Sequence, residues 1–269
     1  MNNQVSHPSH TAPWWLQYEL KYPIGKGVRI AVIDSGWDRT LAHPQVLTGA
    51  AFISADNHLA SPATTDDQDR IGHGTACIDL IFQVAAGAQV IPVRIFNDRL
   101  ETSVTILQAA IKWAVNEGVD IINLSVGTFL TEAILPLYAN CEAARHAGSI
   151  IVAAQNTVDT PSYPAVFDNV ISVGAAGFSN PYHFHYQPDT AVECLAKGGM
   201  QQVRWLGGDT ITTKGTSFSA PYITGIVALL RERYPDADLE QIRKLLNRYA
   251  INRYGPQANI VTTSRASRK

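Results

Sequence analysis

Short runs of apolar, mostly β-branched residues alternate along this chain with longer stretches in which apolar residues recur at helical spacing. The strand-like runs are residues 28–33, 88–96, 119–127, 149–156 and 169–176. The helical stretches are residues 74–84, 103–118, 130–148, 216–233 and 238–250. Such alternation predicts a parallel sheet of nearly continuous apolar strands, covered by helices on both faces. We therefore expect an α/β fold.

The domain organisation follows from the same pattern. No internal repeat and no linker rich in proline and glycine interrupts residues 27–250, so we interpret them as one α/β domain. Residues 1–26 are polar and rich in proline and histidine, and we interpret them as an N-terminal arm. Trp14 and Trp15 in this arm are expected to pack onto the domain. Residues 251–269 are interpreted as a C-terminal tail.

Composition argues against several classes of partner. The net charge is −2, which gives no electrostatic footprint for nucleic acid. No apolar run approaches the roughly 20 residues that span a membrane. The three cysteines, Cys77, Cys141 and Cys194, are too few and too scattered for a disulfide framework or a zinc site.

The N-terminal residues give an indication of the cellular location of the protein. They lack the charged start and apolar core of a signal peptide, which favours a cytoplasmic protein. A mature form cut from a longer secreted precursor is the less favoured alternative.

Polar residues follow several of the expected strands directly. Asp34, residues 123–127 and Asn156 all lie where a strand ends. In open parallel sheets, functional groups gather at the carboxyl ends of the strands. We therefore expect a functional site at this edge of the sheet.

Three short segments combine a reactive side chain with small neighbours: "DSG" with Asp34, "GHGTA" with His73, and "GTSFSAP" with Ser217 at the start of a helix. Taken singly, Asp34 fits a turn residue, His73 a structural histidine and Ser217 a helix cap. Together they supply a nucleophile, a base and a carboxylate that orients the base, which is the logic that makes a serine hydroxyl reactive.

The chain resembles the subtilisin-like serine proteases, or subtilases. The resemblance rests on "AVIDSGWDRTLAHP", "GHGTA" and "GTSFSAPYITGIVALL" in the order Asp, His, Ser, and it covers about residues 27–247. It implies a three-layer fold with a central, mostly parallel sheet flanked by helices. It also implies a serine endopeptidase that needs no cofactor and acts on a peptide or protein substrate.

The resemblance assigns a role to each reactive residue. Ser217 is expected to attack the peptide carbonyl, and His73 to take the serine proton and pass it to the leaving amine. Asp34 is expected to orient His73. The side-chain amide of Asn156 is expected to stabilise the oxyanion together with the backbone N–H of Ser217.

The resemblance also implies which residues contact substrate: Ser125, Val126, Gly127, Ala154 and Gln155. Gln155 stands where the family has a glycine that forms one wall of the primary specificity pocket. A glutamine there would narrow or polarise the pocket, unless its side chain swings away. A narrowed site favours a restricted substrate, such as one dedicated peptide or protein.

Two further sets of residues are candidates for a metal site or a reactive group. The carboxylates of Asp66, Asp67 and Asp69 suit a cation, but they lack the pattern of an EF-hand, so a solvated loop is expected and no metal site. Cys77 follows His73 by one helical turn and is expected to be a small buried residue rather than a nucleophile.

Two other functions remain open on the same motifs. A catalytically inactive relative would bind peptides without cutting them. An acyl transferase or peptide ligase would use the same triad but pass the acyl group to an amine instead of water.

We predict that stability depends little on calcium. The chain is short between residues 81 and 84, where many secreted subtilases carry an extra loop that helps to hold a structural calcium ion. A site filled at 1,000 times its dissociation constant would add about 4 kcal/mol to the free energy of unfolding. Thermal melting with excess calcium and with a chelator measures this, and a large drop in Tm with the chelator would contradict the prediction.

Overall fold

An eight-stranded sheet forms the centre of the computed structural model, which describes residues 13, 15–53, 65–155 and 160–253. The strands are β1 (Arg29–Asp34), β2 (Ala50–Ala51), β3 (Gln89–Arg94), β4 (Ile121–Leu124), β5 (Ile150–Ala154), β6 (Ile171–Ala176), β7 (Phe184–Tyr186) and β8 (Cys194–Lys197). Their order is β2-β3-β1-β4-β5-β6-β8-β7, and all neighbours are parallel except β7 and β8. The crossovers place the carboxyl ends of the five central strands at one edge.

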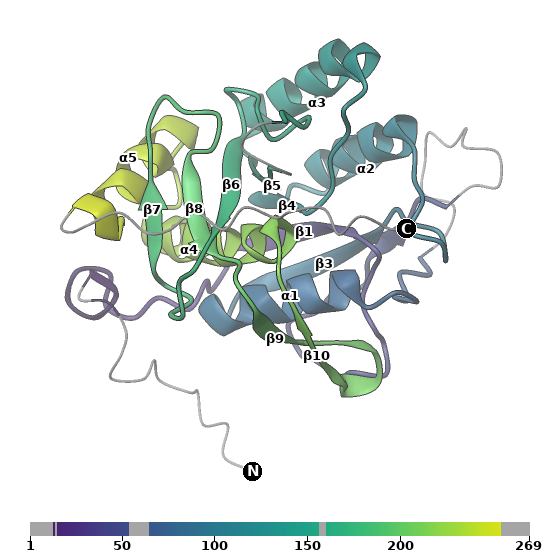
Figure 1. Cartoon of the computed structure of the whole chain (residues 1–269), viewed down its shortest axis with the longest axis horizontal. Helices are drawn as coiled ribbons and strands as arrows, with labels where there is room; N and C mark the ends of the chain where they lie inside the picture. Colours follow the sequence, from purple (N-terminus) through teal and green to yellow (C-terminus); the bar gives the residue numbers. More distant parts are fainter. Residues whose placement is uncertain (1–12, 14, 54–64, 156–159, 254–269) are drawn as a thin grey trace, which may run out of the picture.

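Helices cover both faces of this sheet. They are α1 (His73–Val84), α2 (Val104–Asn116), α3 (Ile134–His146), α4 (Ala220–Arg233) and α5 (Leu239–Tyr249). One core cluster joins α2 and α3 to the sheet, and a second joins α1, α4 and α5 to the opposite face (Figure 1). The expected three-layer α/β fold with a mostly parallel central sheet is confirmed.

Alternation along the strands decides which face each polar residue meets. In β1, Ala31 and Ile33 pack into the core under α2 and α3, while Ile30 and Val32 pack under α1 and α4. Side chains two residues apart share a face. Asp34, two residues after Val32, therefore belongs to the face covered by α1 and α4.

Strand β4 repeats this arrangement. The side-chain oxygen of Asn123 accepts a hydrogen bond from the Thr224 hydroxyl of α4 at 2.8 Å. Ser125, two residues further on, lies on the same side as Asn123. The ends of β1 and β4 thus direct polar groups toward the start of α1 and the segment before α4.

The N-terminal segment packs onto the domain from residue 15 onward. Trp15 begins a short π-helix (Trp15–Glu19), is buried, and its ring centroid lies 5.1 Å from that of Tyr249 in α5. Further along, the Glu232 carboxylate accepts hydrogen bonds from the backbone N–H groups of residues 24, 25 and 26 at 2.6–2.9 Å. The expected packing of Trp15 is confirmed, whereas Trp14 lies outside the described residues.

The expectation of one continuous helix over residues 216–233 is wrong. Residues Thr216–Phe218 form a 3₁₀ turn, and α4 begins only at Ala220. Pro221 lies in the first turn of α4, where its missing N–H costs nothing. Further inside a helix the proline ring would clash with the carbonyl of the residue four positions earlier, which is Ser217.

The segment between β6 and α4 carries strands that the hydrophobic pattern did not indicate. These are β7 and β8 in the main sheet and an antiparallel pair, β9 (Gln201–Arg204) with β10 (Thr210–Thr213). The strands are only three or four residues long, and β9 and β10 are largely polar. Their pairing depends on tertiary contacts more than on a local apolar signal.

The expected solvated loop at Asp66, Asp67 and Asp69 is also wrong for two of the three residues. Asp67 is buried and pairs with the Arg39 guanidinium, and it accepts from the backbone N–H of Gly49 at 2.7 Å. Only Asp66 has a largely exposed side chain. Buried carboxylates are stable only when they are paired or hydrogen-bonded, which the sequence alone does not reveal.

Asp69 holds the start of α1. Its carboxylate is buried and accepts from the backbone N–H groups of Ile71, Gly72 and Thr75 at 2.8–2.9 Å. It also accepts from the Thr75 hydroxyl at 2.7 Å. Asp69 thus satisfies donors that the first turn of a helix otherwise leaves without partners.

No helix within the described parts of the chain has the length and apolar character needed to cross a bilayer.

We predict that Asp69→Ala lowers the free energy of unfolding by about 1–3 kcal/mol or more, because it strands several buried donors. Chemical denaturation measures the loss. Asp66→Ala in the same loop is the matched control. Its exposed side chain forms ion pairs with Arg70 at 3.3 Å and with Arg94 at 3.6 Å, and Arg94 keeps Asp98 as a second partner. Its removal should therefore cost less than about 1 kcal/mol. Equal losses in the two variants would contradict the assignment.

Candidate active site

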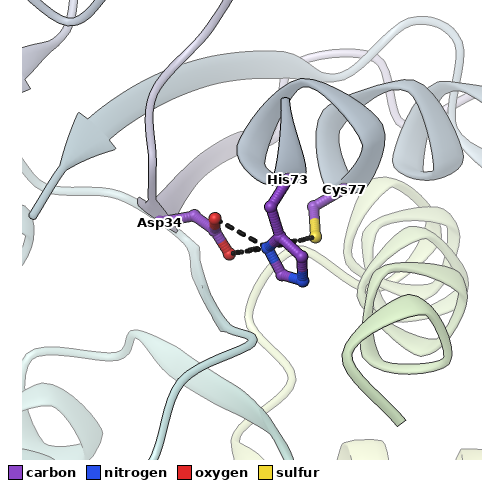
Figure 2. A group of neighbouring side chains, drawn as sticks. All are labelled: Asp34, His73 and Cys77. Carbon is purple, nitrogen blue, oxygen red and sulfur yellow. Dashed lines mark hydrogen bonds and ion pairs between the residues drawn. The ribbon is translucent and has the colours of Figure 1, made fainter. Parts of the chain in front are cut away.

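A buried carboxylate and an imidazole form the centre of the site (Figure 2). His73 Nδ1 lies 2.8 Å and 2.9 Å from the two oxygens of Asp34, and Asp34 is fully buried. The backbone N–H of Ser35 donates to Asp34 Oδ1 at 2.7 Å. Because an ionised carboxylate only accepts, Nδ1 carries the proton and Nε2 is left as the acceptor when the ring is neutral.

The two glycines that flank His73 allow this close approach. Gly72 has φ 103°, and a Cβ there would lie 2.4 Å from the ring of Trp205. A Cβ on Gly74 would lie 2.4 Å from the carbonyl oxygen of Gly36. A side chain at position 74 would push α1 away from the end of β1, and one at position 72 would clash with Trp205 in a backbone conformation that favours glycine.

Two effects act on the pKa of His73 in opposite directions. Burial disfavours the charged imidazole, but the nearby Asp34 carboxylate and its hydrogen bonds outweigh burial and hold the pKa of His73 well above its ordinary value. An opposite charge within a few ångströms favours the protonated form in this way.

Cys77 lies one turn along α1, beside the imidazole (Figure 2). Its fully buried Sγ lies 3.9 Å from His73 Nδ1 and 3.9 Å from Asp34 Oδ2. Burial raises the pKa of the Cys77 thiol, which therefore stays protonated near neutral pH. The expected burial of Cys77 beside His73 is confirmed.

The structure brings the backbone of Ser217 to this pair. Its carbonyl oxygen accepts from the Ser125 hydroxyl at 2.8 Å and lies 3.6 Å from Cys77 Sγ. The Ser217 hydroxyl itself donates to the carbonyl oxygen of Ser125 over 3.5 Å. Among the described residues, no hydrogen bond joins that hydroxyl to His73, whose ring packs against Phe218 at a centroid distance of 5.2 Å.

Four of the five residues expected to contact substrate lie at the carboxyl ends of β4 and β5. Ser125, Val126 and Gly127 follow β4 and are partly or largely exposed, while Ala154 ends β5. Thr128 continues this segment and exchanges backbone hydrogen bonds with Tyr163 at 2.8–2.9 Å. The edge that carries Asp34 therefore also presents an extended segment beside Ser217.

Gln155, the fifth of these residues, turns its side chain toward the segment near Ser162. Its side-chain oxygen accepts from the hydroxyl of Ser162 at 2.8 Å and from its backbone N–H at 3.2 Å. Gln155 is buried, so this amide braces residues 160–162.

Asn156 lies outside the described residues, so its expected part in an oxyanion hole stays a prediction. Sequence reasoning missed Trp205, which covers Gly72, because this tryptophan belongs to no motif and approaches His73 only through the β9–β10 pair. Phe218, by contrast, follows Ser217 directly in the "GTSFSAP" segment, so the sequence did offer a signal that it lies near the site.

A parallel α/β sheet with an aspartate–histidine pair and a serine at its carboxyl edge is typical of serine hydrolases. The model of the subtilase family, Peptidase_S8, matches residues 25–266. The chain belongs to the subtilase family and is a subtilisin-like serine endopeptidase.

Individual relatives agree with this family. The thermostable alkaline protease of Halalkalibacterium halodurans is 29% identical over 268 residues, covering 90% of this chain and 69% of that protein. Subtilisin DY of Bacillus licheniformis is 27% identical over 246 residues, covering 85% of each chain.

Solved structures share the fold. A cold-adapted subtilisin-like serine proteinase superposes with a TM-score of 0.69 at 22% identity, covering 84% of this chain and 83% of that one. Fervidolysin from Fervidobacterium pennivorans, a keratinolytic enzyme related to subtilisin, gives a TM-score of 0.67 at 25% identity, covering 88% of this chain and 40% of that one.

The cytoplasmic location expected from the sequence is wrong, because the subtilisins and alkaline proteases that this chain resembles are extracellular enzymes. The expectation relied on the first residues of the chain, and these do not decide where the protein acts.

We predict that His73 titrates with a midpoint above about 6.5, the ordinary value for histidine. In Asp34→Asn the carboxylate charge is gone and burial dominates, so the midpoint should fall below that value. Ring-proton NMR over a pH series measures both. His43, which stacks on Phe82, is the internal control, and its midpoint should be the same in both proteins. An unchanged His73 midpoint would contradict the assigned electrostatics.

Proposed function

We propose that the chain hydrolyses peptide bonds with Ser217 as nucleophile, His73 as general base and then acid, and Asp34 as the group that orients His73. The substrate is a peptide or a protein. The observation that carries this proposal is the Asp34–His73 pair, in which a fully buried carboxylate holds Nδ1 at 2.8–2.9 Å.

The proton route follows from this tautomer. With Nδ1–H bound to Asp34, Nε2 of the neutral ring is free to accept the Ser217 proton as the hydroxyl oxygen attacks the carbonyl carbon. Asp34 stabilises the resulting imidazolium, which is the same interaction that raises the pKa of His73. The imidazolium then donates the proton to the leaving amine.

The Ser217 hydroxyl has to turn from Ser125 toward His73 to enter this route. It donates to the Ser125 carbonyl over a long distance of 3.5 Å, so little is lost when it turns about χ1 toward His73. Serine–histidine hydrogen bonds are commonly long or misaligned without substrate and tighten in the reactive complex.

The negative charge that develops on the substrate carbonyl oxygen has to be stabilised by hydrogen-bond donors. The backbone N–H of Ser217 has no hydrogen-bond partner among the described residues, which supports its use in the oxyanion hole. We assign the second donor to the side-chain amide of Asn156. Removing one such donor typically costs about 2.7–4 kcal/mol of transition-state stabilisation.

The substrate lies along residues 125–127, with Ala154 and Gln155 on the neighbouring strand end. Gln155 stands where the family has glycine, and its buried side chain is held against residues 160–162 by hydrogen bonds to Ser162 and Thr160. A fixed side chain in place of a glycine supports a restricted set of substrates.

A peptide-binding relative without catalysis is the second candidate. The observation in its favour is that the Ser217 hydroxyl points to Ser125 rather than to His73. In that case a substrate peptide would bind at the same edge and remain intact.

We predict that Ser217→Ala lowers kcat by at least about 10⁴-fold, because the nucleophile is lost while the fold is kept. Turnover of a peptide drawn from a proteome-derived library measures this, with circular dichroism to verify folding. Ser219→Ala is the matched control, since Ser219 is a buried serine of the same segment whose hydroxyl bonds to the Gly215 carbonyl.

The outcomes separate the candidates. Activity lost in Ser217→Ala and kept in Ser219→Ala supports the proposal. A folded Ser217→Ala protein with full turnover rejects Ser217 as nucleophile. Binding of library peptides without any cleavage by the unmodified protein would favour the peptide-binding candidate.

A further inference from the structure

A polar hollow, called here the acidic hollow, opens at the amino edge of the sheet, opposite the edge that carries Asp34 and His73. Its volume is about 370 Å³, and its walls come from α3, from the residues that lead into β5 and β6, from the end of α4 and from the start of α5 (Figure 1). Five carboxylates line it: Glu142, Asp168, Asp236, Asp238 and Glu240. Among the described residues, two basic side chains share this lining, Arg145 and Arg231.

Both of these arginines already have an acidic partner. Arg145 pairs with Glu142 at 2.5 Å, and Arg231 pairs with Asp120, outside the hollow, at 3.3 Å. Three carboxylates of the hollow, by contrast, form no ion pair with any residue that the structure describes: Asp168, Asp236 and Asp238. The acidic hollow therefore keeps an excess of negative charge.

A buried amide in the same wall lacks a hydrogen-bond donor. Asn169 is 4% exposed, and its Nδ2 donates to Glu142 Oε2 at 3.1 Å. Its Oδ1 accepts no hydrogen bond from any described residue. Buried polar atoms without a partner are rare in native proteins, so each one calls for a missing partner. A ligand that fits here brings both positive charge and N–H donors.

The chemistry of the hollow favours a guanidinium group over a metal ion. Three metal-binding side chains converge within 4.8 Å at one place in the described chain, at Asp34, His73 and Cys77, and not in the hollow. A volume of about 370 Å³ also suits a larger cation. A guanidinium group presents five N–H donors in a planar fork and binds carboxylates through two parallel hydrogen bonds. The acidic hollow thus fits an arginine side chain.

The chain itself carries such side chains beyond Arg253, the last residue that the structure describes. Residues 254–269 include Arg265, Arg268 and Lys269 and no acidic residue. Eleven residues separate Arg253 from Arg265. A segment of that length spans at most about 40 Å when extended. A short tether gives a local concentration in the mM range, so even a weak site is filled.

The described chain ends close to the hollow. In its last turn, Ile251–Arg253, the side chain of Asn252 exchanges hydrogen bonds with the backbone of Tyr186 at 2.8 and 3.1 Å. Tyr186 lines a second cavity, and this cavity shares Asp168 and Glu240 with the acidic hollow. Residues 254–269 therefore begin beside a cavity that adjoins the hollow.

We propose that the acidic hollow binds the basic C-terminal segment of the same chain, with an arginine of residues 265–268 paired to Asp168 and Asp236 and donating to Asn169 Oδ1. The docked segment fastens the end of the chain to α3, α4 and α5, on the far side of the sheet from the candidate active site. This proposal goes beyond the proposed function and does not depend on it.

Protection from trypsin tests the docking, because trypsin cuts after an arginine only where the chain can enter its active site. The full chain is incubated with trypsin, and mass spectrometry of the intact protein follows the loss of residues 266–269, which reports cleavage after Arg265. A parallel incubation without trypsin records any cleavage by the protein itself. A synthetic peptide of residues 258–269 gives the rate for the undocked sequence.

We expect cleavage in the full chain to be at least about tenfold slower than in the peptide, because the tether keeps the site filled. Sodium chloride at about 0.5 M should remove most of this difference, since salt screens exposed charges. The double variant Asp168→Asn/Asp236→Asn removes two unpaired charges of the hollow, so its C-terminal segment should be cut about as fast as the peptide.

The matched control is Glu132→Gln/Asp209→Asn, which changes the charge by the same amount at two exposed carboxylates outside the hollow and should keep the protection. Circular dichroism verifies that the variants fold alike. Arg268→Gln/Lys269→Gln is a second variant that leaves the described fold untouched. It should speed cleavage after Arg265 relative to its own matched peptide, because two of the three basic groups are gone.

The outcomes decide the proposal. Protection that is lost in Asp168→Asn/Asp236→Asn and in Arg268→Gln/Lys269→Gln, and kept in the control, supports it. Cleavage of the unmodified chain at the rate of the peptide overturns it, and so does protection that survives in both of those variants or that is lost equally in the control. Protection that rises with protein concentration also overturns it, because the segment then binds a second copy of the chain.

Discussion

The carboxylate of Asp34, at the end of strand β1, has no access to solvent. Much of the surrounding structure serves to offset the cost of burying its charge. An uncompensated buried charge costs several kcal/mol. Asp34 meets this cost by accepting from the backbone of Ser35 and from His73 Nδ1 at 2.7–2.9 Å. Because His73 is the first residue of α1, the helix has to begin beside the end of β1, and the glycines around both segments allow that contact.

The first turn of α1 is held by one further buried carboxylate and by the backbone of Asp38. Asp69 accepts from the backbone at the start of the helix, and Thr75 of that turn also accepts from the backbone N–H of Asp38. Asp38 binds the backbone N–H of Gly207 at 2.6 Å, which ties the β9–β10 pair to the same place. His73 is therefore fixed from the strand, from the preceding loop and from a distant hairpin, as its proposed role as a general base requires.

Cys77 lies at the centre of the candidate site, in the region between α1 and α4. It lies beside the imidazole and near the Ser217 carbonyl, so it fills the space that joins the two halves of the site. A thiol packs there as a small apolar group.

Much of this arrangement was predictable from the sequence, because it depends on residues close together in the chain. Alternating apolar runs indicated the layered fold, and the helical spacing of His73 and Cys77 placed them on one side of α1. The helical pattern of residues 238–250 corresponds to α5, which begins after Asp238. The grouping of Asp34, His73 and Ser217, which are far apart in the chain, was expected only from the resemblance to the subtilases that their three motifs carry.

The remaining features were decided by tertiary structure alone, because each depends on partners far apart in sequence or on where a side chain turns. The burial of Asp67 requires Arg39, and the covering of Gly72 requires Trp205. The direction of Gln155 depends on Ser162 across a turn of the chain. The sequence alone therefore determined the fold class and the candidate reactive residues. Only packing decided which carboxylates are buried, how the helix that carries His73 is held, and where the hydroxyl of Ser217 points.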